Sequence, residues 1–496
     1  MPVCRGVAGG AGVSSVDVAV LWFRQDLRLA DNPALAAALA THERVVPVYL
    51  HAPEEAGTWA PGAASRWWLH HSLEALDAAL RARGARLLVR RGPSAAALVA
   101  LARETGARAV YWNRRYEPAA LAADRSVQAT LAAAGLSCET SSGALLFEPG
   151  AIARASGGPF RVFTPFWRAC LARLPGESPL PAPPALPPVP PGLSSLPIDA
   201  LGLLPRPRWD TGLARAWESG EEAGLRRVER FLEAGVADYA AARDLPSAPG
   251  TSRLSPYLHF GEVSPRQVLW ALHARAGTTA LGPGAEAFLR EIGWREFAHH
   301  VLFHFPQTPD TPLDGRFAAF PWRQGADELL AAWQGGRTGI PLVDAGMREL
   351  WATGWMHNRV RMVVASLLTK NLRWSWLDGA RWFWDTLVDA DLANNTLGWQ
   401  WTAGCGADAA PYFRVFNPVR QGERFDPEGS YVRRWVPEVG RLPARWVHRP
   451  WEAPAAVRAE AGVELGRGYP WPVVDLDASR RDALAVYRSL VGDRAG

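Results

Sequence analysis

The sequence predicts an α/β domain with a parallel, Rossmann-like sheet, followed by an all-α domain. Three observations carry this prediction. Short apolar runs alternate with helical patterns over the first 140 residues, which is typical of a parallel sheet covered by helices. A proline-rich segment then interrupts the pattern, and from about residue 210 the apolar residues recur with the helical period. The expected organisation is a disordered tail over 1–15, an α/β domain over 16–140, a connector over 141–209, a helical domain over 210–480 and a short tail over 481–496.

The elements of the α/β domain follow from the length of each apolar run. The expected strands are Val16–Phe23, Val45–Leu50, Leu87–Val89 and Ala109–Trp112. The expected helices are Asn32–Ala40, Ala64–Arg83, Ser94–Thr105 and Pro118–Ala134. A dinucleotide fingerprint needs a glycine-rich turn directly after the first strand, but that turn reads Arg24-Gln25-Asp26-Leu27-Arg28. The sheet is therefore not expected to bind NAD.

A proline-rich segment within the connector precedes the helical domain. Nine prolines lie within Pro175–Pro191, and a segment of this composition forms neither a helix nor a central strand. Strand patterns are nearly absent beyond it. The expected helices are Glu221–Ala234, Ser264–Arg275, Ala285–His304, Gly325–Gly335, Val343–Thr353, Asn358–Leu372 and Gly379–Leu387.

Composition excludes several classes of protein. The 54 basic residues exceed the 49 acidic ones by only five, so net charge alone does not indicate a polyanion partner, although a local basic patch remains open. The four cysteines are Cys4, Cys138, Cys170 and Cys405; none form a C-x-x-C pair, so no metal site is predicted and a reducing cytoplasm is expected. No apolar run reaches about 18 residues, and the first fifteen lack the apolar core of a signal peptide.

Two segments of the helical half combine charged, hydroxyl and aromatic side chains. Thr251–Pro256 places three hydroxyls beside Arg253, which suits a bound anion; the alternative is a helix cap with a surface arginine. In the second segment, Glu291, Trp294 and Arg295 share one helix face, which suits a planar heterocycle. The alternative there is a Glu–Arg pair beside a core tryptophan.

Two later segments are more unusual. Thr353–Met362 places Asn358, Arg361 and Met362 on one helix face beside Trp355, and the alternative is a helix start with surface arginines. Asp389–Trp401 holds two Asp, two Asn and two Trp in thirteen residues after an apolar run, which indicates a buried polar site. Buried carboxylates need partners, and Arg361 and Arg295 are the candidates. A run of cap residues followed by structural tryptophans is the alternative.

These four segments, in this order, resemble the photolyase/cryptochrome flavoprotein family. Further matches are Leu21–Leu29 with Asp31-Asn32, Asp344–Arg348 and Asp408–Pro418, and the likeness extends from about residue 17 to 480. The resemblance implies an α/β antenna domain joined by a long linker to a helical domain that binds FAD. The positions that match FAD contacts in the family are Tyr239, Thr251, Ser252, Arg253, Leu254, Ser255, Phe288, Arg295, Arg361, Asp389, Ala390, Asp391 and Asn395.

The resemblance also implies an activity, in which reduced FAD donates a light-driven electron to a cyclobutane pyrimidine dimer flipped out of UV-damaged DNA. The positions that match dimer contacts are Glu291, Trp294, Asn358, Met362 and Trp401, and those that match other DNA contacts are Arg243, Arg359 and Gln421. Trp399, Trp376 and Trp322 match the family's photoreduction chain, and Asn395 matches the residue opposite flavin N5. Arg361 would pair with Asp389. A monomer is expected.

The sequence leaves three alternatives open. A blue-light sensor of the cryptochrome type would share the fold and FAD, but plant cryptochromes carry an aspartate where Asn395 stands, and only 19 residues follow Asp477. Enzymes that repair the (6-4) photoproduct have histidines at the positions where this chain has Asn358 and Met362, so repair of the cyclobutane dimer is preferred. A non-catalytic nucleic-acid binder would not need the buried polar segment.

The second chromophore is less determined by the sequence. Pro61–Leu69 resembles the plant-cryptochrome-like bacterial photolyases often called class III. Tyr116-Glu117-Pro118 is followed by Ala119-Ala120, so the acid that holds folate in enterobacterial photolyases is missing. Class III enzymes bind folate differently, so methenyltetrahydrofolate is the first expectation and 8-hydroxydeazaflavin the second.

Overall fold

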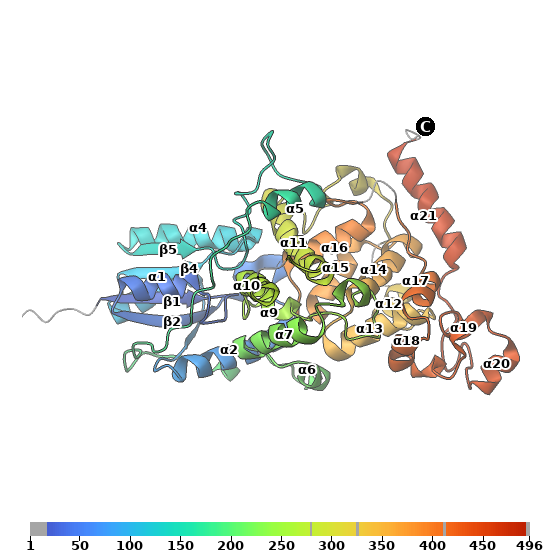
Figure 1. Cartoon of the computed structure of the whole chain (residues 1–496), viewed down its shortest axis with the longest axis horizontal. Helices are drawn as coiled ribbons and strands as arrows, with labels where there is room; N and C mark the ends of the chain where they lie inside the picture. The colour runs from blue at the N-terminus through green and yellow to red at the C-terminus, as the bar shows by residue number, and fades with distance from the viewer. Residues whose placement is uncertain (1–16, 278–279, 324–326, 410–412, 493–496) are drawn as a thin grey trace, which may run out of the picture.

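A computed structural model describes residues 17–277, 280–323, 327–409 and 413–492. The expected tail over 1–15, the start of the expected helix at 325 and part of the motif over 408–418 lie outside these residues. Figure 1 shows the sheet and its helices at one end of the long axis and the helical half at the other. The predicted division into an α/β part and an all-α part is confirmed.

The sheet has five parallel strands in the order β3-β2-β1-β4-β5. The strands are β1 (Val18–Phe23), β2 (Arg44–His51), β3 (Leu88–Arg91), β4 (Ala109–Asn113) and β5 (Ser137–Ser141). The helices among them are α1 (Pro33–Thr41), α2 (Ala63–Arg81), α3 (Ser94–Thr105) and α4 (Pro118–Ala133). Four strands were predicted within a few residues. β5 was missed because an edge strand that reads Ser-Cys-Glu-Thr-Ser carries no apolar pattern.

Both faces of the sheet are buried, as parallel sheets require. Along β1, Val18, Val20 and Trp22 pack into a core under α3 and α4. The alternate residues Ala19, Leu21 and Phe23 pack into a second core. That second core continues without a break into α7 and α9–α11 of the helical half, so the two parts of the chain share one apolar interior.

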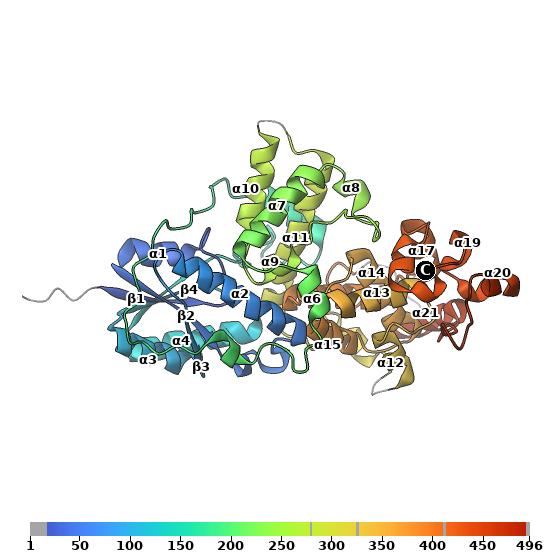
Figure 2. The ribbon, with the colours of Figure 1, turned by 90° about the horizontal axis from the view of Figure 1, so that it is seen from below.

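The connector is mostly irregular. Between α5 (Phe163–Leu171) and the 3₁₀ turn η2 (Ile198–Leu201) the described residues form no helix or strand, which confirms the prediction from the prolines. The segment runs along the α/β domain and is anchored by backbone bonds such as Leu196 N–H to the carbonyl of Val89, at 2.9 Å. Figure 2 shows its path beside the sheet before α6 (Thr211–Ala216).

The helical half is built from the following helices: α7 (Glu221–Ala234), α8 (Tyr239–Ala242), α9 (Ser255–His259), α10 (Pro265–Ala276), α11 (Pro283–His304), α12 (Glu328–Gln334), α13 (Pro341–Thr353), α14 (Asn358–Ser366), α15 (Trp376–Thr386), α16 (Leu392–Ala403), α17 (Pro418–Phe425), α18 (Ser430–Trp435), α19 (Ala444–Val447), α20 (Ala455–Glu460) and α21 (Leu476–Val491). The expected helix Asn358–Leu372 changes to a π-helical turn at Leu367–Asn371. The expected domain end at residue 480 falls inside α21.

The turn after β1 docks the helical half onto the sheet. Arg28 is 1% exposed and donates to the carbonyls of Gly143, at 2.6 Å, and Gly261, at 2.8 Å. Gly261 has a φ of 65°, and a Cβ there would lie 2.2 Å from the carbonyl oxygen of Gln25. Any larger residue would therefore separate the two halves. The arginine-rich turn that replaces a nucleotide fingerprint thus fixes where α9 lies, just ahead of the site described below.

None of the helices in the described ranges has the length and apolarity needed to cross a membrane.

Candidate functional site

Three of the four polar segments meet at one buried carboxylate. Asp389 lies in the loop before α16 and is 7% exposed. Arg361 of α14 donates to both of its oxygens, at 2.8 and 3.1 Å, and Ser255 at the start of α9 donates its hydroxyl at 2.6 Å. The expected pair of Arg361 with Asp389 is therefore present, and the charge of this largely buried aspartate is compensated.

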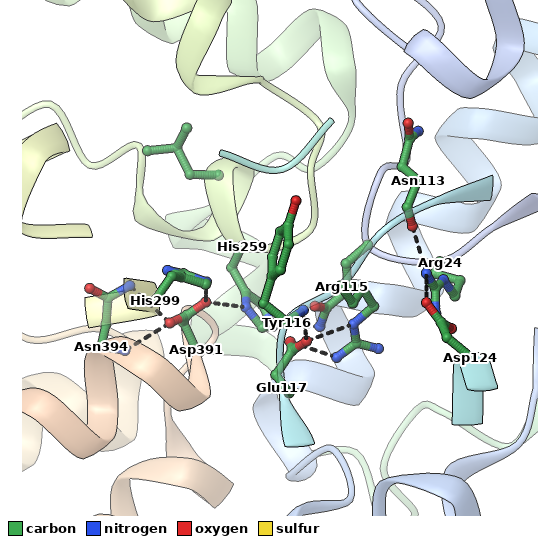
Figure 3. A network of polar contacts seen from close by, with 12 residues as sticks. Arg24, Asn113, Arg115, Tyr116, Glu117, Asp124, His259, His299, Asp391 and Asn394 are labelled. Carbon is green, nitrogen blue, oxygen red and sulfur yellow. Dashed lines mark hydrogen bonds and ion pairs between the residues drawn. The ribbon is translucent and has the colours of Figure 1, made fainter. Parts of the chain in front are cut away.

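A second carboxylate caps α16. Asp391 accepts a bond from the backbone N–H of Asn394 at 2.8 Å, which is the N-cap bond that starts the helix. Figure 3 shows the same carboxylate facing two histidines: His299 Nε2 lies 3.4 Å away and His259 Nδ1 lies 3.7 Å away. Burial alone would raise the pKa of Asp391, but the charge of His299 and the nearness of both imidazole rings outweigh it and hold the pKa well below its usual range.

The pKa of His299 is shifted in the opposite direction. Burial would lower the pKa of His299, but Asp391 outweighs it, so the pKa is raised above its ordinary value and the ring tends to stay protonated. Neither His259 nor His299 was singled out from the sequence. The available signal was weak, because a histidine on an apolar helix face resembles a core residue until its partner is known.

Breaking this pair should have a pH-dependent cost. We expect His299→Gln to lower the free energy of unfolding by about 3 kcal/mol near pH 5, because it leaves a buried carboxylate without its cation. The raised pKa of His299 means that its contribution is complete below about pH 6.5 and is lost as the pH rises through the folded-state pKa. The lowered pKa of Asp391 means that its contribution is present above about pH 4 and is lost in stronger acid. Urea unfolding at pH 5 and pH 9 measures the difference.

The control for this experiment is His273→Gln, since His273 is an exposed residue on α10. It should change the unfolding free energy little at either pH. A deficit of His299→Gln that is equal at pH 5 and pH 9 would show that the ring acts through packing and not through its charge.

Arg295 does not reach either aspartate, which corrects the expectation that it is a partner of these carboxylates. It donates to the carbonyls of Ala144, at 2.9 Å, and Leu258, at 3.3 Å. The reason is that α11 presents Arg295 to the connector and to the end of α9, while His299, one turn later, faces the loop before α16. The arginine instead fixes the connector against α9.

Glu291 has a different partner from the one that helix spacing suggests. Arg243, next to α8, donates to Glu291 at 2.5 Å. The neighbouring Asp244 pairs with Arg359 of α14 at 2.8 Å. The guanidinium of Arg359 also lies over the ring of Phe425, at 4.4 Å from its centroid, at the end of the helix that carries Gln421. The expected DNA contacts Arg243 and Arg359 thus belong to one cluster that adjoins Glu291, and Gln421 lies one turn before Phe425 on α17.

The remaining dimer-contact candidates come from α11, α14 and α16. Trp294 is half-buried and stacks on Phe163 of α5, with ring centroids 3.8 Å apart and planes at 7°. Asn358 is exposed and Met362 is half-buried, one turn apart on α14. Trp401 of α16 is half-buried and lies 6.4 Å from the ring of Phe416. α16 packs against both α11 and α14, so the three helices that carry these side chains are neighbours.

The segment expected to bind phosphate has an unusual backbone. Arg253 has a φ of 53°, a conformation that residues other than glycine rarely adopt. Its guanidinium lies over the rings of Trp355, at 4.3 Å, and Trp217, at 5.2 Å, with Glu349 3.9 Å away. The half-buried Thr251 and Ser252 flank it, and Leu254 is buried. The structure therefore gathers a half-buried cation and hydroxyls at the start of α9.

Two of the aromatic positions expected to contact FAD pack against each other. Tyr239 and Phe288 are both buried, with ring centroids 5.5 Å apart in an edge-on arrangement. Ala390 is 1% exposed between the two aspartates. Asn395, half-buried on α16, donates its amide to the carbonyl of Ala380 at 3.0 Å, which fixes the orientation of its side chain.

The three tryptophans run from the interior toward the surface. Trp399 and Trp376 are each 3% exposed, and Trp322 is half-buried. A Cβ added to Gly379, one turn after Trp376 on α15, would lie 2.1 Å from the ring of Trp399, so this helix touches that ring directly. Arg323, next to Trp322, forms an isolated β-bridge with Trp374, two residues before Trp376. The three rings therefore belong to segments that are in contact in that order.

The interface with the sheet contributes further charges near Asp391. Figure 3 shows Arg115 and Glu117 between the histidines and the Arg24–Asp124 ion pair of the α/β domain. Burial would raise the pKa of Glu117, but the ion pair with Arg115 outweighs it and lowers the pKa to about 2. The carboxylate is therefore ionised at the boundary of the two halves.

Comparison with known proteins identifies similar chains over nearly the whole length. A family model described as the FAD binding domain of DNA photolyase matches residues 288–489, and one described as DNA photolyase matches residues 19–187. The deoxyribodipyrimidine photo-lyase of Agrobacterium fabrum is 45% identical over 474 residues, which cover 95% of this chain and 98% of that protein. Cryptochrome-1 of Arabidopsis thaliana is 41% identical over 95% of this chain and 70% of its own length. The crystal structure of a bacterial class III photolyase from Agrobacterium tumefaciens superposes with a TM-score of 0.93 at 44% identity, covering 98% of this chain and 100% of that one.

Proposed function

The chain belongs to the photolyase/cryptochrome family, and from this premise we propose that it is a deoxyribodipyrimidine photo-lyase, which uses light to split cyclobutane pyrimidine dimers in DNA. One observation carries the proposal beyond the family. Ser255 and Arg361 converge on the buried Asp389, ahead of Asn395 on α16. An asparagine at position 395 favours repair over the cryptochrome type of signalling, for which the resemblance implies an aspartate.

The chemistry of the site suits FAD. Hydroxyls, a half-buried guanidinium and the start of α9 offer donors to a diphosphate, and the two carboxylates would hold the sugar and flavin side. FAD would supply the absorption of light and the one-electron chemistry. We propose that Tyr239, Thr251–Ser255, Phe288, Arg361, Asp389, Ala390, Asp391 and Asn395 hold it. Arg295 would act indirectly, by holding the connector against α9.

The chain's own groups then have separate tasks. The Arg361–Asp389 pair fixes the charge beside the cofactor, and the His299–Asp391 pair fixes it at the cap of α16. The amide of Asn395, held by Ala380, presents a neutral side chain that does not supply an acidic proton to the flavin. Trp399, Trp376 and Trp322 would carry electrons from the surface inward when the cofactor is oxidised.

The dimer would lie on the surface made by α11, α14 and α16. Trp294 and Trp401 offer flat apolar faces, worth about 1–3 kcal/mol for each stacked base. Glu291 and Asn358 would read base edges, with Met362 filling the space between them, and the Arg243 ion pair holds the Glu291 carboxylate in one orientation. A lesion that already weakens pairing and stacking costs less to flip out of the helix than an intact base pair.

The cluster around Arg243 and Arg359 is the proposed surface for the DNA backbone. We expect Arg359→Ala to weaken binding to damaged and undamaged DNA alike and to reduce the slope of log K against log salt by about one unit. The reason is that a phosphate contact carries no base information. Fluorescence anisotropy over a series of salt concentrations measures the slope. Arg230→Ala, an exposed arginine on α7, is the control and should leave the slope as it is. An unchanged slope in Arg359→Ala would remove this residue from the DNA surface.

The proposal extends to the second chromophore, the oligomeric state and the location of the protein. An antenna chromophore would bind in the α/β part, methenyltetrahydrofolate before 8-hydroxydeazaflavin, and absorbance of the material released on denaturation identifies it. The protein would act as a monomer in the cytoplasm.

The experiment that tests the function is blue-light exposure of the reduced protein with an oligonucleotide that carries one thymine dimer. Recovery of thymine absorbance is the expected result. Repair of a (6-4) lesion in place of the dimer would overturn the substrate, and repair of neither lesion would favour a light sensor.

A further inference from the structure

Exposed arginines without acidic partners lie on α17 and α19, next to the proposed surface for the DNA backbone. Arg420 and Arg424 lie one turn apart on α17, and Arg445 lies on α19. Within the described residues none of the three forms an ion pair with a carboxylate, and Glu423, which precedes Arg424, pairs with Arg449 at 3.3 Å. Unpaired charges of one sign on exposed residues indicate a partner of the opposite sign.

The two helices that carry these arginines pack directly against each other. A Cβ added to Gly422 of α17 would lie 2.3 Å from Nδ1 of the buried His448, at the end of α19. Nε2 of the same ring lies 2.7 Å from the carbonyl oxygen of Asp426, at the end of α17. Figure 2 shows α8, α17 and α19 on the same side of the helical half. The arginines of α17 and α19 therefore extend the side of the molecule on which the DNA cluster lies.

Aromatic rings hold the guanidiniums of these arginines in place. The ring of Phe425 contacts both Arg359, at 4.4 Å from its centroid, and Arg424, at 5.0 Å. On α19 the ring of Trp446 lies 4.7 Å from the guanidinium of Arg445. A guanidinium stacked on a ring keeps the N–H donors at its edge free for phosphate oxygens and loses less side-chain freedom when it binds them. The stacked guanidiniums begin at Arg359, which is the proposed phosphate contact.

This arrangement suits an extended polyanion better than a compact ligand. Arg424 and Arg445 stack on separate rings of separate helices, so their charges follow one another along the molecule. A strand of DNA carries one phosphate about every 3.4 Å along the helix axis, so successive arginines can each meet a different phosphate. The contact of Arg359 with Phe425 favours the backbone of the same DNA over an acidic segment of another protein, because it joins these arginines to the proposed DNA surface.

We propose that Arg420, Arg424 and Arg445 bind the phosphate backbone of the duplex that flanks the lesion, on the α19 side of the dimer surface. The inference rests on the proposed function, since a dimer held at α11, α14 and α16 fixes where the flanking duplex lies. It adds that the protein contacts duplex beyond the lesion, so that its affinity depends on the length of the DNA. The contacts would carry no base information and would leave the choice of lesion to the dimer surface.

Fluorescence anisotropy with two dimer-centred duplexes tests the proposal. One has about 10 base pairs and extends about 17 Å to either side of the dimer, and the other has about 24 base pairs and extends about 40 Å. Arg445→Ala should reduce the slope of log K against log salt by about one unit on the long duplex and leave it as it is on the short one. Arg445→Lys should keep the parental slope on both, because a point charge is enough for a phosphate contact.

The control is Arg480→Ala, which removes an exposed arginine of α21. Figure 1 shows α21 and α19 on opposite sides of this end of the molecule, so this variant should keep the parental slope on both duplexes. An unchanged slope of Arg445→Ala on the long duplex, or an equal loss on both lengths, would overturn the inference. Binding of polyglutamate that Arg445→Ala abolishes, with no change of slope on DNA, would assign these arginines to an acidic protein segment instead.

An undamaged duplex of about 24 base pairs separates this inference from the proposed function. Arg445→Ala should lose about one unit of slope there too, because a phosphate contact does not depend on the lesion. The same loss in a protein that shows no preference for the dimer-containing duplex would support the backbone contacts and overturn the proposed repair role. A protein that prefers and repairs the dimer while Arg445→Ala keeps the parental slope on every duplex would overturn the backbone contacts alone.

Discussion

Replacing Trp399 with phenylalanine should slow light-driven reduction of the oxidised flavin by about tenfold or more, equivalent to at least about 1.4 kcal/mol in the barrier. Trp399 is 3% exposed on α16, and its ring touches α15, the helix that begins at Trp376. Phenylalanine keeps most of the packing but is much harder to oxidise than tryptophan. Repair needs only reduced flavin, so the same variant should repair dimers normally after chemical reduction. Bleaching of the visible flavin band under blue light, followed by the repair assay, measures both.

The matched control is Trp382→Phe on the same helix as Trp376. The ring of Trp382 stacks on the exposed Trp351, with centroids 6.1 Å apart, and so points away from the proposed chain. It should photoreduce at the parental rate. If Trp399→Phe also photoreduces at that rate, the assignment of the electron chain is wrong.

Replacing Arg361 with glutamine should release FAD and destabilise the protein. The side chain of Asp389 is 3% exposed, and without Arg361 its one remaining side-chain partner among the described residues is the hydroxyl of Ser255. Removing one partner of a buried ion pair costs about 3 kcal/mol or more, roughly a hundredfold in an equilibrium constant. The flavin-to-protein absorbance ratio after purification and the midpoint of urea unfolding measure the two effects.

Two further variants separate charge from packing in that experiment. Arg381→Gln removes an exposed arginine on α15 and should change neither quantity. Adding Asp389→Asn to Arg361→Gln removes the uncompensated carboxylate, so the double variant should recover part of the lost unfolding free energy. Full flavin content and an unchanged midpoint in Arg361→Gln would show that the pair does not support the site.

The hydrophobic pattern of the sequence predicted most of the helices and strands. It missed those that form only through contacts with other parts of the chain. α3 and α7 were placed at their observed bounds, because apolar residues recur with the helical period throughout each. β5 was missed because its residues are polar and it becomes a strand only by pairing with β4. The helix α16 was not predicted, because Asp391, Asn394 and Asn395 at its start are typical of turns until the cap bond of Asp391 is seen.

The candidate site shows the same division. The sequence determined the order of the domains, the four polar segments and, through their resemblance, the family, because periodicity and motif order are properties of the chain itself. Only the tertiary structure decided the partners: His299 and not Arg295 for Asp391, and Arg243 for Glu291. The physical reason is that the strength of a polar contact depends on distance and burial, and these are set where helices from distant parts of the chain pack together.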